Sequence, residues 1–334
     1  MKFYRFSTAA SFVGAVIGAG FASGREIALF FADTSPLTPI LAGVFLGVFC
    51  FLFLELGRKY NGNVYMFFGK GGYTFQMTVR LCCLITVCAM IAASESVVYS
   101  LFSFRGGGII TAILALLTVF WGVDKINFSN FLIVPIIVIL VVYLFILEPS
   151  FFIDKPFLII PAFTYSAMNI ITGGYFVATF SGNYTRKDNI IIAVISGAVL
   201  SLLLILVYLL IQKNVNDSMP LMSTAERLGI GKIGSIIMYL AVFSTLTGCL
   251  SVAGKNQKIS SVAVTCIGLL GAVWGFDKLV DTFYPLMGIV GAIAAVSCLI
   301  KIVGQKFCTK KSKPLGNDGL QKGNGAVHTR SHNT

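Results

Sequence analysis

The chain has 334 residues, of which 57% are hydrophobic and only 11% are charged, and its formal net charge is +12. Soluble globular domains contain roughly 25% charged residues, so this composition excludes an ordinary soluble domain and indicates a polytopic membrane protein. Excess Lys and Arg is typical of the cytoplasmic loops of membrane proteins, and we expect no nucleic-acid partner. Both histidines, His328 and His332, lie in the polar C-terminal segment, so the apolar part offers no imidazole for acid–base catalysis, and we do not expect an enzyme.

Apolar runs long enough to cross a bilayer recur along the whole chain. A hydrocarbon core about 30 Å thick requires roughly 20 apolar residues per helical span. Ten runs satisfy this requirement, near residues 6–32, 37–57, 73–103, 106–123, 129–148, 157–181, 189–212, 231–253, 257–275 and 279–303. Lys and Arg concentrate in the loops on one side, which predicts that both termini are cytoplasmic. Residues 304–334 are rich in Gly, Asn and Lys and are predicted to form a disordered basic cytoplasmic tail.

The first run contains the stretch "VGAVIGAGFASGRE" at residues 13–26, in which glycine is unusually frequent for a membrane helix. Such a stretch after a basic N-terminus also resembles a cleaved signal peptide. Apolar character resumes at Ile27, which favours a retained first span. We therefore expect a first membrane helix that is interrupted near Gly18 and Gly20.

A short motif occurs twice, as Trp121-Gly-Val-Asp-Lys and Trp274-Gly-Phe-Asp-Lys, with the two copies 153 residues apart. Five predicted spans separate the copies, and because five is odd, the second half has the opposite orientation in the membrane. The sequence thus predicts a 5+5 inverted repeat, with residues 1–149 as the first repeat and 150–303 as the second. Inverted repeats are typical of secondary transporters, whose sites lie at discontinuous helices near the bilayer midplane.

The offset of the repeat relates the glycines of span one to Gly173 and Gly174 in span six. Unpaired backbone groups cost several kcal/mol in hydrocarbon, so a helix break is tolerated only where protein, water or a ligand satisfies them. The alternative is close packing of helices through small residues. A break exposes carbonyls that can bind a cation and N–H groups that can bind an anion. A small zwitterion or carboxylate transported with Na⁺ fits both.

With these breaks the chain resembles the LeuT fold of the amino acid–polyamine–cation superfamily, and its opening motif resembles that of the YkvI-type bacterial membrane proteins. The resemblance covers all ten spans and implies an all-α bundle with helices 1 and 6 broken, in a bacterial cell membrane. It also implies a sodium site built from two carbonyls of span one and from a carbonyl and two hydroxyls of span eight. The matching residues are Gly14, Ile17, Ala241, Ser244 and Thr245. The alternative for the two hydroxyls is a hydrogen bond to the backbone of their own helix.

The resemblance further implies that the N–H groups of Ala19 and Gly20, followed by Phe21, contact a substrate carboxylate. Glu95 is an ionisable residue inside span three and is therefore a candidate functional group, either for a substrate ammonium or for a coupling proton. The alternative is a structural hydrogen bond to a neighbour. Glu26 and Glu55, near helix ends, are expected to be interface or packing residues.

Further polar lining is expected from Asn169, Thr172 and Gly173 of span six. Asn and Thr can instead simply cap a broken helix. Arg25 and Asp281 resemble the charged outer gate of the fold, although two solvated interfacial charges are the alternative.

These features predict a secondary transporter that takes up an amino acid or a related small solute with Na⁺ by alternating access, without a bound cofactor. Two alternatives remain at this stage, a proton-coupled carrier that uses Glu95 and an amino-acid-sensing receptor subunit of the same fold. The sequence does not indicate the substrate or the oligomeric state.

Overall fold

The computed structural model describes residues 3–149, 154–217, 219–255 and 257–310, and within these ranges every regular element is helical. The α-helices are α1 (Phe3–Val16), α2 (Ala19–Ala22), α3 (Arg25–Phe31), α4 (Leu37–Lys59), α5 (Gly72–Phe102), α6 (Gly107–Phe120), α7 (Val123–Leu147), α8 (Ile159–Asn169), α9 (Tyr175–Ala178), α10 (Arg186–Ile211), α11 (Pro220–Arg227), α12 (Gly231–Ala253), α13 (Lys258–Ala272) and α14 (Phe276–Lys310). Short 3₁₀ segments lie at Val64–Gly71, Ser181–Asn183 and Gln212–Asn214, and a π-helical segment lies at Ile170–Gly174.

Six of the described helical stretches are long and apolar enough to cross a membrane. They are Leu37–Lys59, Val64–Phe102, Val123–Leu147, Arg186–Asn214, Gly231–Ala253 and Phe276–Cys298. The helices α6 and α13 are apolar but shorter, and the remaining two predicted spans are the interrupted ones. The all-helical membrane architecture is therefore confirmed, while the count of ten crossings stays a prediction.

The chain divides into two units, residues 1–296 and 297–334. In the second unit, α14 continues as a helix to Lys310. Helical structure thus extends past residue 304, where the predicted tail begins, and the disordered tail itself stays a prediction. The rest of the predicted tail, 311–334, lies outside the described residues.

The first span is interrupted twice. Helix α1 ends at Val16, Gly18 is extended with φ −87° and ψ −171°, and the four residues of α2 follow. A second interruption at Gly24, whose φ is +82°, separates α2 from α3. The interruption at Gly18 agrees with the expectation for this glycine-rich stretch, whereas the second interruption, at Gly24, was not expected.

The sixth span is interrupted in a different way. Between α8 and α9 the chain forms the π-helical turn Ile170–Gly174, and its flanking residues keep right-handed helical torsions. Gly173 packs against α1, where an added Cβ atom would lie 3.3 Å from Val16 and 3.5 Å from Ala15. The π-helical turn thus widens the helix at this point but does not break it. Gly173 serves for close packing against α1.

The two copies of the repeated motif lie in similar turns. Trp121 and Trp274 each come shortly after an apolar helix, are mostly exposed, and precede a glycine with positive φ, +92° at Gly122 and +85° at Gly275. A new long helix starts directly after each glycine. The order of elements is thus the same at both copies, while the inverted repeat stays a prediction.

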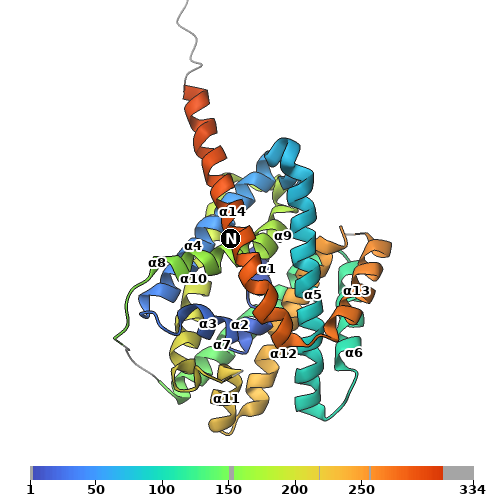
Figure 1. Cartoon of the computed structure of the whole chain (residues 1–334). Coiled ribbons are helices and arrows are strands. Elements are labelled where there is room, and N and C mark those ends of the chain that lie inside the picture. Colours follow the sequence, from blue (N-terminus) through green and yellow to red (C-terminus); the bar gives the residue numbers. More distant parts are fainter. Residues whose placement is uncertain (1–2, 150–153, 218, 256, 311–334) are drawn as a thin grey trace, which may run out of the picture. The chain divides into compact units, whose positions relative to one another are not determined.

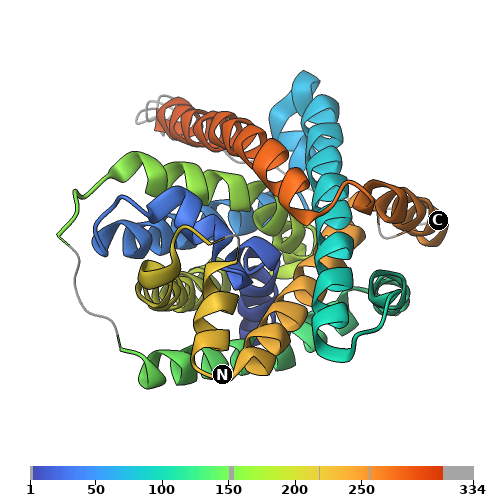
Figure 2. The same ribbon diagram turned by 60° about the horizontal axis from the view of Figure 1, so that its bottom comes forward.

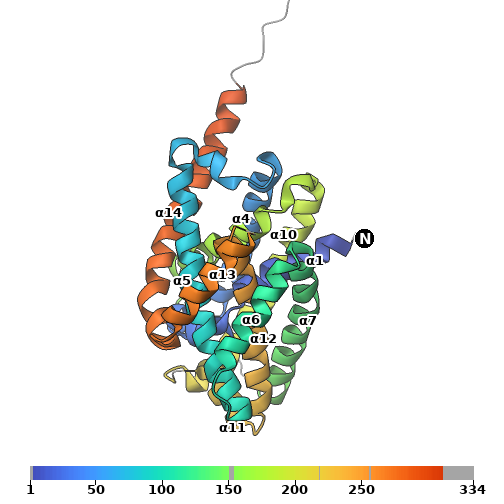
Figure 3. The same ribbon diagram turned by 90° about the vertical axis from the view of Figure 1, so that its right-hand side faces the viewer.

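Helix α1 occupies the interior of the first unit. It contacts α7, α10 and α12 as well as the π-helical turn, and Figure 1 and Figure 2 show the dark blue N-terminal helices surrounded by later segments of the chain. On another side, α6 and α13 lie against α5, which also packs along α12 (Figure 3). The interrupted first span is consequently shielded from lipid, as exposed backbone groups require.

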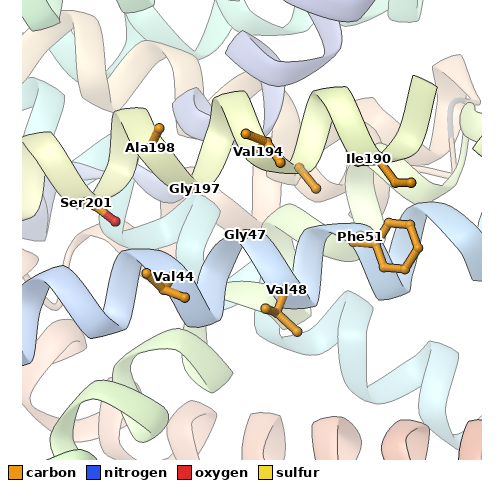
Figure 4. Close-up of a pocket in the computed structure, with 10 residues that line it drawn as sticks. Val44, Gly47, Val48, Phe51, Ile190, Val194, Gly197, Ala198 and Ser201 are labelled. Carbon is orange, nitrogen blue, oxygen red and sulfur yellow. The ribbon is translucent and has the colours of Figure 1, made fainter. Parts of the chain in front are cut away.

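Helices α4 and α10 pack closely through small residues. Gly47 and Gly197 face each other where the two helices cross (Figure 4), and an added Cβ atom on Gly47 would lie 3.1 Å from the Gly197 Cα atom. The groove beside this contact has a volume of about 620 Å³ and is lined mainly by aliphatic side chains such as Val48 and Val194. It lacks the polar groups that recognise a charged solute.

We predict that Gly43→Ala destabilises the protein, because a Cβ atom at this position would lie 2.4 Å from the Ser201 nitrogen and 2.5 Å from its Cα atom. Such overpacking against backbone typically costs about 1–3 kcal/mol, and thermal denaturation in detergent measures it. Gly71→Ala is the matched control, since no atom lies within 4 Å of its Cβ position and its φ is −83°. Equal melting temperatures for the two variants would contradict the packing argument.

Candidate functional site

The end of α1 turns backbone carbonyls away from its own helix. In a continuous helix the Gly18 N–H would donate to the Gly14 carbonyl. Here it donates to the Val16 carbonyl at 2.9 Å, since Gly18 is extended. The Gly14 carbonyl is thereby released for another partner.

That partner comes from α12. The Thr245 hydroxyl donates to the Gly14 carbonyl at 2.9 Å and to the Ile17 carbonyl at 3.2 Å. Other hydroxyls in the described helices make the local bond instead, for example Thr247 with the Ser244 carbonyl at 2.9 Å. The Thr245 hydroxyl therefore bonds to the break in span one and not to its own helix. Three oxygen atoms, the Thr245 hydroxyl and the Gly14 and Ile17 carbonyls, meet there in a buried environment.

The neighbouring Ser244 also faces α1. Its Oγ atom would lie 2.0 Å from a Cβ atom added to Gly14, so a larger residue at that position would displace the Ser244 hydroxyl. Ala241 lies one turn before Thr245 on the same side of α12 and is fully buried. All five residues assigned to the sodium site by resemblance thus belong to the α1–α12 contact.

Sequence reasoning missed Asn130 of α7. It is fully buried, its Oδ1 atom accepts a hydrogen bond from Ser244 at 2.8 Å, and its Nδ2 atom has no partner. One turn earlier, Asn127 accepts a hydrogen bond from Ser11 of α1 at 2.5 Å. The sequence did contain a signal for this contact, namely two asparagines one helical turn apart in an apolar span. Buried amide groups need hydrogen-bond partners, so such a pair indicates a polar contact with another helix.

Beside the three oxygens lies a small central cavity, to which five spans contribute. Its lining includes Gly18, Glu26, Thr86, Asn169, Thr172, Thr245, Tyr284 and Met287. The cavity measures about 20 Å³, which is enough for about one water molecule. Small-molecule pockets typically measure roughly 300–1,000 Å³, so this conformation is closed around its centre.

The residues expected to contact a substrate are only partly brought together. Asn169 and Thr172 line the cavity, where their side chains also bond to backbone carbonyls one turn away, Tyr165 and Asn169 respectively. Gly173 faces α1 instead. Phe21 is buried, but it is not among the residues of the cavity wall.

The N–H groups expected to hold a carboxylate lie at the start of α2. The Ala19 N–H points to the Met90 sulfur at 3.5 Å, which is a weak acceptor. The carboxyl group of Glu26 packs over Gly20, whose added Cβ atom would lie 2.1 Å from the Glu26 Oε1 atom. The carboxylate-binding role of these two residues stays a prediction.

The structure corrects the expected position of Glu95. Its carboxylate does not face the cavity but accepts hydrogen bonds from the N–H groups of Gly106 at 2.8 Å and Gly108 at 2.7 Å. These groups belong to the start of α6, where free N–H groups and the helix dipole favour an acid. Glu95 therefore fastens α5 to α6, which was the structural alternative.

The acid in the cavity wall is Glu26. Its side chain is 2% exposed, and its Oε2 atom has no hydrogen-bond partner among the described residues. The expectation that Glu26 is an interface or packing residue is wrong, because the interruption at Gly24 redirects α3 and brings the start of this helix to the cavity. Sequence position suggested a helix end, and only the second interruption makes that end internal.

Charged side chains cluster at the side of the membrane where α3, α7 and α10 end. Arg25 pairs with Asp281 at 3.3 Å, with both side chains partly exposed. Glu148 pairs with Lys213 and Arg227, each at 2.6 Å. Burial alone would raise the pKa of Glu148, but the hydrogen bonds from Arg227 and Lys213 outweigh it and hold this pKa below its ordinary value.

At the opposite side, where α4 ends and α5 begins, a polar cavity of about 280 Å³ is present. Its wall includes Asn61, Gln76, Arg80, Tyr175, Thr179 and Lys255. On the same side, Arg5 of α1 pairs with Asp188 of α10 at 2.6 Å. The protein thus has an ion pair at both ends of its first span and a polar cavity at one end.

Comparison with known proteins gives structural relatives alone. No family model matches the chain, and no curated protein matches it either. Among solved structures, it is similar to Mhp1, a nucleobase-cation-symport-1 family transporter, in a closed conformation with bromovinylhydantoin bound, with 14% identity over 92% of this chain and 93% of that one and a TM-score of 0.59. The chain has a LeuT-like fold.

Two further structures support this assignment. A substrate-bound, outward-open Na⁺-coupled sialic acid symporter is 11% identical over 85% of this chain and 76% of that one, with a TM-score of 0.62. The inward-facing conformation of Mhp1 is 14% identical over 86% and 73%, with a TM-score of 0.56. At these identities the similarity establishes the LeuT-like fold alone.

We predict that Thr245→Val weakens Na⁺ binding about tenfold or more, since it removes an oxygen ligand whose interaction with a charged group is worth about 1.5–3 kcal/mol. The measurement is the rise in melting temperature of the purified protein as NaCl replaces choline chloride. Thr265→Val is the matched control, because this buried hydroxyl bonds only to the Ser261 carbonyl of its own helix. An unchanged NaCl response in Thr245→Val would show that the three converging oxygens do not bind Na⁺.

Proposed function

We propose that the protein is a secondary active transporter that couples uptake of a small amino-acid-like solute to Na⁺. The observation that carries this proposal is the convergence of the Thr245 hydroxyl with the Gly14 and Ile17 carbonyls at the break of span one. A helix break in a membrane span is retained where it serves a site. Its two helices, α1 and α12, come from opposite repeats.

The donor set favours a hard cation such as Na⁺ over a soft transition metal. It consists of neutral oxygens from two carbonyls and one hydroxyl, with the Ser244 hydroxyl near Gly14. Hard cations prefer such oxygen ligands, whereas soft transition metals prefer thiolate and imidazole. Na⁺ binding would replace the hydrogen bonds of Thr245 and join α1 to α12.

Alternating access fits the sizes of the cavities at the two ends and at the centre of the first span. The central cavity is closed, one end carries the polar cavity near Arg80, and the other is covered by the Arg25–Asp281 pair. Similar folds are known in closed, outward-open and inward-facing states. We propose that the polar cavity is a cytoplasmic vestibule and that the Arg25–Asp281 pair belongs to an outer gate.

The opening motif "VGAVIGAGFASGRE" supports assignment to the YkvI-type proteins of the amino acid–polyamine–cation superfamily. We accordingly place the chain in a bacterial cell membrane with both termini in the cytoplasm, as its basic loops predict. Proton coupling through Glu95 is not proposed, because this carboxylate is engaged by the start of α6.

Uptake into proteoliposomes tests the proposal. We expect the purified protein to accumulate label from a pool of the twenty radiolabelled L-amino acids when an inward Na⁺ gradient is imposed, and to stop when choline replaces Na⁺. Thr245→Val should lower this uptake, while Thr265→Val should retain it.

Binding of the pool without gradient-driven uptake would indicate a receptor and refute transport. Uptake that persists without Na⁺ and follows a pH gradient would refute Na⁺ coupling.

The outer gate makes a separate prediction. We expect Asp281→Arg to slow uptake, because it places two like charges together, and the double variant Arg25→Asp with Asp281→Arg to restore it. Stability should change by less than about 1 kcal/mol, as is usual for an exposed ion pair. Arg58→Ala, which removes a surface pair with Glu55, is the control. A double variant as slow as the single one would contradict the pairing.

A further inference from the structure

The buried carboxyl group of Glu26 is unusual for a membrane interior. It is 2% exposed, it lines the central cavity, and its Oε2 atom has no hydrogen-bond partner. No Arg or Lys of the described residues forms an ion pair with it, and the nearby Arg25 is directed to Asp281. A buried charge without a partner is costly, and ionisable residues within membrane spans generally mark function.

The groups that face Glu26 are polar but carry no charge. Tyr284 of α14, Asn169 and Thr172 line the same cavity as Glu26, and Tyr165 of α8 packs against Phe30, which lies one turn after Glu26 on α3. The Tyr165 hydroxyl is itself buried and makes no hydrogen bond of ordinary geometry within the described part of the chain. Two buried polar groups in this region therefore have room for a further hydrogen-bond partner.

An aromatic ring in the cavity wall adds a second preference. The side chain of Tyr284 lines the same cavity as Glu26. Aromatic faces attract organic cations. A carboxylate and an aromatic ring in one cavity are the chemistry of an ammonium site, whereas the candidate Na⁺ site consists of neutral oxygens on α1 and α12.

We propose that Glu26 binds the positively charged nitrogen of the transported solute. An ammonium group has three N–H donors, so it can satisfy both Glu26 and the Tyr165 hydroxyl, whereas a single bound proton satisfies only one acceptor. The solute is consequently an amine-bearing molecule, and a carboxylic acid without an amine is rejected by the negative charge of Glu26. This inference deepens the proposed transport function and rests on it.

The closed cavity sets the condition for binding. Its volume of about 20 Å³ cannot hold an amino acid, so the solute enters only after the helices that surround it separate. Glu26 belongs to α3 and Tyr284 to α14, and the outer ion pair Arg25–Asp281 joins the same two helices. Binding of an ammonium group and opening of the outer gate therefore both change the contact between α3 and α14.

Competition in the uptake assay tests the assignment. The probe is the pool of twenty radiolabelled L-amino acids, competed by the pool of their decarboxylated amines or by the pool of their deaminated carboxylic acids. For the unmodified protein we expect the amines to compete and the acids not to compete. Glu26→Gln should also take up the labelled amino acids poorly, so its affinity for the amine pool is read from the rise in melting temperature. This affinity should fall at least about thirtyfold, as expected on removal of one member of a buried charge pair.

Two controls separate this role from a structural one. Glu26→Gln should keep the NaCl-dependent rise in melting temperature, which shows that the protein is folded and its Na⁺ site intact. Glu55→Gln, whose carboxylate pairs with Arg58 and Asn189 away from the cavity, should keep the uptake and the amine preference. A Glu26→Gln protein that retains amine preference, or one that loses only its pH dependence, overturns the proposal.

The outcomes also distinguish this inference from the proposed function. If the unmodified protein shows no gradient-driven uptake, transport fails, and the melting temperature in the presence of the amine or acid pool still reports binding at Glu26. If uptake occurs and both pools compete equally, the transport proposal stands and the role of Glu26 is refuted.

Discussion

The hydrogen bonds from Thr245 to the Gly14 and Ile17 carbonyls hold the centre of this structure together. A broken helix inside a membrane is stable only if its released backbone groups find partners. Here α12 supplies one for span one, and α1 is buried among α7, α10 and α12 as a result. The same three oxygens form the Na⁺ site that we propose, so one set of atoms would serve both the stability of the break and ion binding.

The close approach of α1 and α12 depends on glycine at a single position. A Cβ atom on Gly14 would lie 2.0 Å from the Ser244 Oγ atom, so another residue would displace the Ser244 hydroxyl from its place between α1 and α7. Asn130 extends the contact to α7 through Ser244. An ion bound at the break would therefore act on three helices at once, which is a physical route from ion binding to helix rearrangement.

Several acidic side chains of the described residues have partners, whereas the buried Glu26 keeps one oxygen atom without a partner. Glu95 accepts two N–H groups of α6, Asp188 pairs with Arg5, and Glu148 is held by two basic side chains. Glu26 faces the cavity with a free oxygen atom. Partnered acids stabilise the scaffold, whereas an unpartnered buried acid invites a ligand.

The sequence by itself determined the helical membrane class and the interruption of span one, because composition and glycine content are local properties. The residues of the α1–α12 contact were indicated only by the resemblance to the LeuT fold. The repeated Trp-Gly turn is local too, since left-handed torsions require glycine at Gly122 and Gly275. Only the tertiary structure decided which acid lines the cavity. Glu26 and Glu95 lie in similar apolar surroundings in the sequence, but the turn at Gly24 directs one inward, and the free N–H groups of α6 capture the other.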